Sequence, residues 1–285
     1  MSQNKELFSV IRRIVAHIDT FRKEPEFTNE LIRRRKNLVD TPPVSNSDFL
    51  RNLAHIIAYA HADSSRVTNM IRNDGYDKVW FDYDVDAVAA LNPCDVVEEH
   101  WETTLSPIMN GSKAYFVVMA ARAIQRVGTI STLFNESSIP TCIQTAADIP
   151  AFWKGFASLK KQMKEHGVPY LGSVTSLSHM LLHLGYDCVK PDVIVMRVAV
   201  NLGIITEKEA KTDKGLKKVA RLLQQYALEY EIRPSEIDMY FLIQEGQSEA
   251  MTWVRPNFAP VYDITSLPAL PALRSSVSLE PEPAM

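Results

Sequence analysis

The residues best placed for chemistry lie within 169–198, where a short turn, an apolar helix pattern and an isolated acid follow one another. The acid is Asp192, which stands directly after Pro191 and before a run of Val, Ile and Met. A carboxylate fixed at the start of an apolar helix could stabilise a developing positive charge or take a proton from an attacking water. The alternative is that Asp192 only caps the helix, a common reason for this residue type at such a position.

The sequence PYLGS at 169–173 predicts a tight turn between two helices. One helix pattern ends near Gly167, and the next begins at Ser173 or Val174. The first backbone N–H groups of the second helix lack intrahelical acceptors, and with the helix dipole they form a site for an anion. The phosphate of a nucleic-acid backbone is one such anion. The stretch therefore combines a predicted phosphate site with a carboxylate that accepts backbone N–H bonds.

Helical periodicity dominates the elements that must position this stretch, and it predicts an all-α fold. Ser47 is the predicted N-cap of the first clear helix, and Gly128 and Gly167 are predicted to end two others. We find no Asn-Gly or Asp-Gly hairpin signal between alternating strands. The predicted helices span 47–73, 113–128, 148–167, 173–185, 192–203, 213–230 and 233–246.

The composition is that of a soluble globular protein. The chain has 285 residues, of which 46 % are hydrophobic and 23 % are charged, enough for one large domain or two lobes with a core. No apolar run approaches the roughly 20 residues of a membrane span, and charged side chains interrupt the first residues, so we expect neither a membrane anchor nor a signal peptide. The three cysteines lie far apart without metal-ligand spacing, which favours a reducing compartment.

The distribution of charge is more informative than the net charge of −3. Residues 154–221 contain twelve Lys and Arg against six Asp and Glu, whereas residues 82–102 contain seven acids and no Lys or Arg. One part of the molecule could therefore face phosphates while another is repelled by them. The alternative is two solvated faces of opposite sign.

Two segments carry a resemblance to a known superfamily. The chain reads VPYLGSVTS at 168–176 and VKPDVIVMRVAVNLGI at 189–204. These segments resemble the hairpin and the aspartate motif of the helix-hairpin-helix (HhH-GPD) DNA glycosylases, the superfamily of endonuclease III, MutY and AlkA. Residues 57–71, 105–124 and 233–246 resemble further segments of that superfamily in the same order, so the likeness covers about residues 46–250.

The resemblance implies a two-lobed helical fold with a helix-hairpin-helix and a cleft between the lobes. Residues 46–204 would form the helical domain with the hairpin and the catalytic acid, and residues 205–254 would form C-terminal helices. Residues 1–45 would form N-terminal helices that pack with the C-terminal lobe. Residues 255–285 contain many prolines and no periodicity, which predicts a disordered tail.

The resemblance also implies roles for individual residues. Asp192 would be the catalytic carboxylate that stabilises the oxocarbenium-like sugar. The base pocket and the wedge that fills the duplex gap would come from His61, Tyr59, Trp80 and Trp153. The alternative is that the three aromatic residues belong to the core and that His61 is a surface residue of its helix. DNA phosphates would be bound at the hairpin, with a monovalent cation as the superfamily often uses, and by nearby cations; the residues are Leu171, Gly172, Ser173, Val174, Thr175, Lys190 and Arg197, with Lys154 as a further cation.

Several positions depart from the superfamily pattern. Tyr170 replaces the first hairpin glycine, and Tyr does not readily adopt the positive φ that Gly tolerates. Val174 stands where bifunctional members carry a Schiff-base lysine, so we expect no lyase activity. The four-cysteine pattern of an iron–sulfur cluster is absent from the sequence, and Ile194 stands where a histidine often follows the acid.

The resemblance therefore implies a monofunctional DNA N-glycosylase that acts on a flipped damaged or modified base, as in base excision repair. We expect double-stranded DNA as its partner, no cofactor, no resident metal, no membrane, a monomeric state, and a cytoplasmic (nucleoid) or nuclear location. Two other functions remain open. One is a related enzyme of viral thymine hypermodification, which changes the base substituent and retains the base; the other is a DNA-binding protein without catalysis.

Overall fold

The computed structural model describes residues 2–20, 27–29, 31 and 44–245, and these residues contain helices and no strand. The all-α prediction is confirmed for this part of the chain. Residues 1, 21–26, 30 and 32–43 of the predicted N-terminal segment, and the whole predicted tail at 255–285, lie outside the described residues. The elements are α1 (Ser2–Ile18), α3 (Asn46–Tyr59), α4 (Ser64–Arg72), α5 (Gly75–Val79), η2 (Phe81–Tyr83), α6 (Val85–Ala90), α7 (Pro93–His100), η3 (Trp101–Leu105), η4 (Ser106–Ile108), α8 (Ser112–Val127), α9 (Ser131–Ser137), α10 (Asp148–Glu165), α11 (Val174–His183), α12 (Val193–Asn201), α13 (Glu207–Ala210), α14 (Asp213–Glu229) and α15 (Pro234–Glu245).

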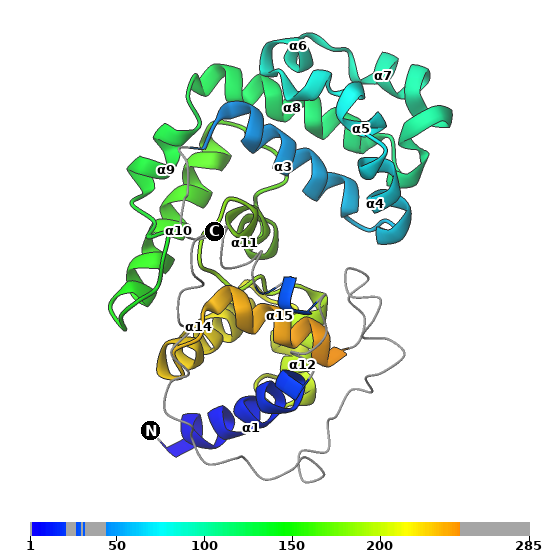
Figure 1. Ribbon diagram of the computed structural model, residues 1–285. Coiled ribbons are helices and arrows are strands. Elements are labelled where there is room, and N and C mark those ends of the chain that lie inside the picture. The colour runs from blue at the N-terminus through cyan, green and yellow to red at the C-terminus, as the bar shows by residue number, and fades with distance from the viewer. Residues whose placement is uncertain (1, 21–26, 30, 32–43, 246–285) are drawn as a thin grey trace, which may run out of the picture.

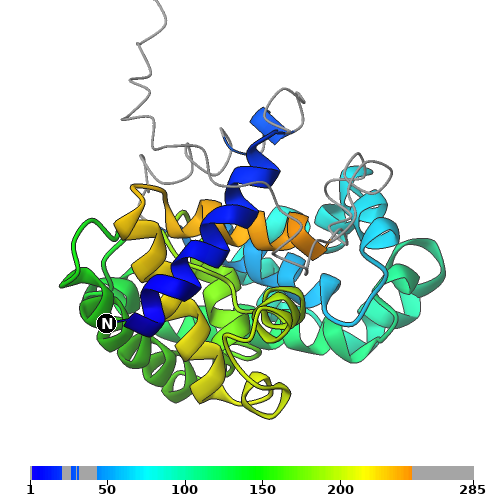
Figure 2. The same cartoon turned by 90° about the horizontal axis from the view of Figure 1, so that it is seen from below.

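The helices form an upper group and a lower group, with α9, α10 and α11 between them (Figure 1). The upper group comprises α3 to α8, in which α8 packs against α3 and α6. The lower group comprises α1, α12, α14 and α15, and α15 contacts each of the other three. Helix α1 lies over α15 in the view from below (Figure 2), so the N-terminal helix packs with the last described helix. No described helix is long and apolar enough to cross a membrane.

Six predicted helices are confirmed within a few residues of their bounds, namely α8, α10, α11, α12, α14 and α15. Their ends are encoded locally. Gly128 ends α8 with a φ of 82°, and Gly167 follows α10 with a φ of 72°. Glycine tolerates this left-handed conformation because it has no Cβ. These helix boundaries could be predicted from the sequence because glycines end the helices locally.

The predicted single helix at 47–73 is wrong, because the structure has two helices there, α3 and α4. His61 adopts a φ of 53° between them, which no α-helix accommodates. Asp63 then starts α4 by accepting hydrogen bonds from the backbone N–H groups of Ser65 and Arg66. The predicted N-cap is wrong as well: Ser45 rather than Ser47 caps α3, through a hydrogen bond from the backbone N–H of Asp48.

The lower and middle helices are joined by a polar contact inside the core. The Trp153 indole Nε1 on α10 donates a hydrogen bond of 2.8 Å to the Gln224 side chain on α14. Nearby, Gly155 of α10 lies so close to α9 and its following turn that an added Cβ would be 2.6 Å from the Cα of Ile139. Helix α10 therefore packs tightly on both sides and fixes where the chain enters the turn at 168–173.

Candidate functional site

Asp192 occupies the N-cap of α12, as predicted. Its Oδ1 accepts hydrogen bonds from the backbone N–H groups of Ile194 and Val195, at 2.9 and 3.0 Å. Its Oδ2 lies 2.9 Å from Nζ of Lys190, and each of these two side chains is 19 % exposed. The two carboxylate oxygens therefore differ: the helix start fixes Oδ1, whereas Oδ2 is held by a side chain that can move.

The turn between α10 and α11 resembles a glycine-bearing hairpin in its backbone although Tyr170 stands in it. Tyr170 adopts a φ of 71°, the left-handed conformation that costs a non-glycine residue about 1 kcal/mol. Its ring packs against Phe116 of α8, with 6.3 Å between ring centroids. Ser173 then caps α11 by accepting a hydrogen bond from the backbone N–H of Ser176. The substitution of Tyr for Gly thus leaves a positive φ in the turn.

Three helices hold the loop that carries Asp192. The Thr175 hydroxyl on α11 donates a hydrogen bond of 2.9 Å to the carbonyl of Pro191. The backbone N–H of Lys190 donates to Asp238 Oδ1 on α15, at 2.8 Å. Since Asp192 itself starts α12, the carboxylate is fixed relative to α11, α12 and α15 together. The structure thus gives Thr175 a direct contact to the acid loop.

The remaining hairpin residues divide between core and surface. Leu171 and Val174 are buried, whereas Gly172 and Ser173 are exposed at the start of α11. An added Cβ at Gly172 would meet no atom within 4 Å, so solvent lies beside this backbone. Arg197 is exposed on α12, and Lys154 is exposed on α10. The accessible backbone at 172–173 is the part of the turn that an anion could reach.

Lys190 was predicted as a phosphate contact, but its amine is paired with Asp192 instead. The sequence did not reveal this pair, because residues two apart in a loop meet only if the backbone turns between them; here the N–H of Asp192 donates to the carbonyl of Lys190 at 2.8 Å. A second feature missed from the sequence is a histidine pair on α11. His179 and His183 have their Nε2 atoms 3.0 Å apart, as their i, i+4 spacing allows.

His179 of this pair is affected by the charge of the same Lys190. Burial lowers the pKa of His179 well below its ordinary value, and the positive charge of Lys190 and the proximity of His183 lower it further. His179 is therefore neutral at physiological pH and adds no charge beside Asp192. Among the residues that the structure describes, no group of three or more His, Cys, Asp or Glu side chains is arranged to hold a metal ion.

Asp187, an acid that the sequence analysis did not single out, lies on the same loop. Its side chain is 4 % exposed and accepts a hydrogen bond of 3.3 Å from the backbone N–H of Ser235, in the first turn of α15. Burial raises the pKa of Asp187 to about 6, while the Ser235 hydrogen bond and the charge of Arg233 act in the opposite direction. Asp187 thus anchors the loop to α15, and its exposure is too small for contact with a substrate.

The four residues predicted to form the base pocket are not gathered in one place. Trp80 is fully buried beside Tyr76, and Trp153 is 5 % exposed between Gln224 and the Arg221 guanidinium, which lies 5.4 Å from the centre of its ring. Neither ring has a face free for a base, because neighbouring side chains cover it. For both tryptophans the pocket prediction is therefore corrected to a core position.

Tyr59 and His61 lie at the break between α3 and α4. The Tyr59 hydroxyl is hydrogen-bonded to the hydroxyl of Thr68 at 2.9 Å and so ties the two helices together. His61 is exposed. Behind them, the buried Lys113 Nζ donates a hydrogen bond of 3.0 Å to the carbonyl of Ala58, and burial lowers the pKa of this amine. The break between α3 and α4 is thus held by side-chain hydrogen bonds and carries one exposed imidazole, that of His61.

Comparisons of this chain with protein-family models, with curated proteins and with solved structures find no match. The site is therefore described by its own geometry: a carboxylate caps α12 and pairs with Lys190, and Thr175 of α11 holds its loop through the Pro191 carbonyl.

Proposed function

We propose that this protein is a monofunctional DNA glycosylase of the helix-hairpin-helix type, which hydrolyses the bond between a flipped base and its deoxyribose. The observation that carries the proposal is the placement of Asp192. Its Oδ1 is fixed by two backbone N–H groups, its side chain is 19 % exposed, and its loop is hydrogen-bonded to α11, the helix that follows the turn at 168–173. A rigid carboxylate next to a potential phosphate site is the arrangement that glycosidic hydrolysis of DNA needs.

The reaction would use the charge on Asp192. As the bond between C1′ and the base nitrogen breaks, its electrons leave with the base and the sugar acquires oxocarbenium character. Asp192 stabilises that cation through Oδ2. The oxygen of a water molecule bonds to C1′, one of its protons passes by way of the carboxylate to the departing base, and the other remains on the new hydroxyl. The Lys190 amine, 2.9 Å from Oδ2, would have to move aside as the sugar approaches.

The turn would hold the DNA next to this acid. The first N–H groups of α11 and the exposed backbone of Gly172 and Ser173 would contact a phosphate, with Arg197 as an added cation. The target base must leave the stack to bring C1′ to Asp192. In this proposal the upper and lower groups of helices would be the two lobes, the DNA would contact both, and His61 would enter the gap in the duplex.

The strand-incision assay tests the proposal directly. Duplexes that each carry uracil, 8-oxoguanine, hypoxanthine, 3-methyladenine or 5-hydroxymethyluracil are incubated with the wild type and with Asp192→Asn, then treated with hot alkali. We expect the wild type to give alkali-dependent cleavage of one duplex and Asp192→Asn to lose it. Asp84→Asn is the matched control, because Asp84 caps α6 through the N–H of Ala87 at an exposed position in the upper group.

Each other outcome has a defined meaning. Cleavage without alkali would show lyase chemistry and would point to Lys190 as the amine. Retained DNA binding without excision of any of these bases would contradict the proposal and favour an enzyme that retains the base or a protein that only binds DNA. Nucleoside analysis of the treated duplex separates those two, because only the former changes the base.

A further inference from the structure

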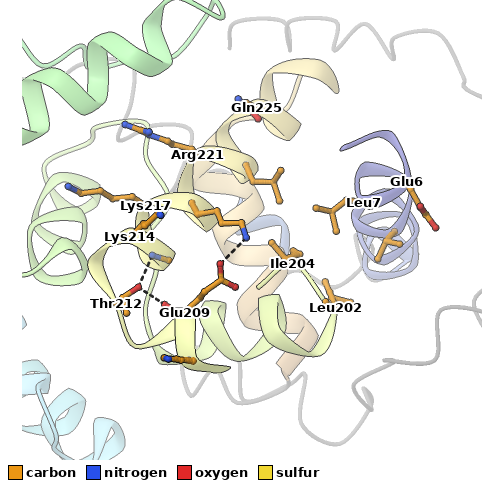
Figure 3. A pocket seen from close by; sticks show the side chains of 16 residues that line it. Glu6, Leu7, Leu202, Ile204, Glu209, Thr212, Lys214, Lys217, Arg221 and Gln225 are labelled. Carbon is orange, nitrogen blue, oxygen red and sulfur yellow. Dashed lines mark hydrogen bonds and ion pairs between the residues drawn. The ribbon is translucent and has the colours of Figure 1, made fainter. Parts of the chain in front are cut away.

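A cavity lies away from Asp192, between α1, α13 and α14 (Figure 3). Its volume is about 950 Å³, within the size range of small-molecule sites. Leu202, directly after α12, lines one end of it. Since Asp192 starts α12, the whole length of that nine-residue helix, about 14 Å, separates the acid from the cavity.

One part of the cavity is positively charged. Lys208, Lys214, Lys217 and Arg221 line it, and within the described ranges none of these four side chains forms an ion pair. Figure 3 shows Lys217 and Arg221 projecting from α14 on the side away from α1. The chain as a whole carries a net charge of −3, whereas the cavity lining contains five Lys and Arg against two Glu, so the positive charge here is a local feature.

The acid at the centre of the lining does not neutralise these cations. Glu209 accepts hydrogen bonds from the backbone N–H and the hydroxyl of Thr206 and pairs with Lys218 at 3.2 Å. These contacts, the Thr206 N–H foremost, lower the pKa of Glu209 to about 2. Because both oxygens are engaged, Glu209 balances the charge of Lys218 only.

The other part of the cavity is apolar. It is lined by Leu7 and Val10 of α1, Leu222 of α14, and Leu202 and Ile204; among these side chains, Ile204 is buried and the others are partly exposed. Figure 3 shows Leu7 projecting from α1 toward Ile204. An inorganic anion would contact the cations and leave the apolar side chains exposed to water. A neutral hydrocarbon would cover the apolar side chains and leave the cations without a counter-charge.

We propose that this cavity binds an amphiphilic anion, with a phosphate or carboxylate head on Lys214, Lys217 and Arg221 and an apolar body on the leucine side. This proposal does not depend on the glycosylase proposal, and the two are tested by different experiments. We infer this class of ligand because positively charged and apolar side chains line the same cavity, whose volume suits a small molecule.

Titration calorimetry on the full chain tests the site, with monomeric dodecyl phosphate as the probe. We expect saturable binding that is at least about tenfold tighter than the binding of inorganic phosphate or of decanol. Replacement of Lys214, Lys217 and Arg221 by Gln should weaken binding about tenfold or more, and Leu7→Ser should weaken it as well. The matched control replaces Lys78, Lys161 and Lys164 by Gln; these exposed lysines lie outside the cavity, and the charge change is the same.

Further measurements distinguish a lipid ligand from a soluble one and define the results that would contradict the proposal. Retention on phosphatidylcholine vesicles that contain phosphatidic acid would identify a lipid surface, whereas binding of the monomeric probe alone would identify a soluble metabolite. Equal affinity for inorganic phosphate and dodecyl phosphate would overturn the proposal, as would equal losses in the cavity and control variants. Absent probe binding, with DNA affinity lowered by the cavity variant only, would instead assign these cations to a DNA surface.

Discussion

Replacing Asp192 by Asn and by Ala separates the catalytic role of the acid from its role as a helix cap. Asparagine can keep the hydrogen bonds of Oδ1 with the N–H groups of Ile194 and Val195, because Asn and Asp are equally good N-caps. It removes the charge that Oδ2 offers to Lys190 and to a substrate. Alanine removes both the charge and the cap.

The stability changes can be worked from these contacts. Losing the ion pair between two side chains that are each 19 % exposed should cost about 1–2 kcal/mol, between the value of a surface pair and that of a buried one. Losing the cap should add about 1 kcal/mol in Asp192→Ala. We therefore expect unfolding free energies in the order wild type, Asn, Ala, measured by urea denaturation.

Activity should not follow that order. If Oδ2 stabilises the sugar cation, Asn and Ala should lose single-turnover excision to a similar extent, by about 100-fold or more. In the Asp192→Asn background, Lys190→Met should cost little further stability, because its partner charge is already gone. Excision by Asp192→Asn within about threefold of the wild type, at full folding, would refute the catalytic assignment and leave Asp192 as a cap only.

Three further predictions concern stability. Burial raises the pKa of Asp187 to about 6 in the folded state from its ordinary value of 3.8, so the folded state holds the proton more tightly. The free energy of unfolding should therefore fall by up to about 3 kcal/mol as pH rises from about 4 to about 6. The urea midpoint of the wild type minus that of Asp187→Asn should fall over this pH range, and a constant difference would contradict the prediction. Gly215→Ala should destabilise by about 1–3 kcal/mol, because its Cβ would lie 2.0 Å from the carbonyl oxygen of Glu209, whereas Gly172→Ala, with open space beside it, should leave the melting temperature unchanged. Asp82→Gly should raise the melting temperature, because Asp82 has a φ of 50° that glycine adopts without strain; a lowered value would show that its side chain matters more than the backbone.

The sequence predicted those features whose cause is local. Asp192 caps α12 because the acid, the preceding proline and the apolar run are adjacent in the chain. The break between α3 and α4 was missed because apolar periodicity continues across it, and a single left-handed residue at 61 gives no compositional signal. Trp80 and Trp153 could not be assigned, since helical spacing places a ring on a face but does not say what covers that face.

The cavity was beyond sequence reasoning for a different reason. Its apolar side comes from α1 and its cationic side from α14, which are about two hundred residues apart in the chain. Periodicity gives each helix a buried stripe but does not pair the helices. The basic excess at 154–221 was visible in the sequence, yet only the fold shows that four of its cations surround one cavity.

The contact between Arg221 and Trp153 gives the molecule an optical reporter of its own. The guanidinium lies 5.4 Å from the centre of an indole ring that is almost completely shielded from water and whose Nε1 is held by Gln224. Indole emission responds to a charge held over the ring. An anion that draws Arg221 toward the cavity should therefore shift the fluorescence of Trp153, and Trp153→Phe identifies its share of the emission among the four tryptophans of the chain. Occupancy of the cavity can then be followed in the unlabelled protein by light alone.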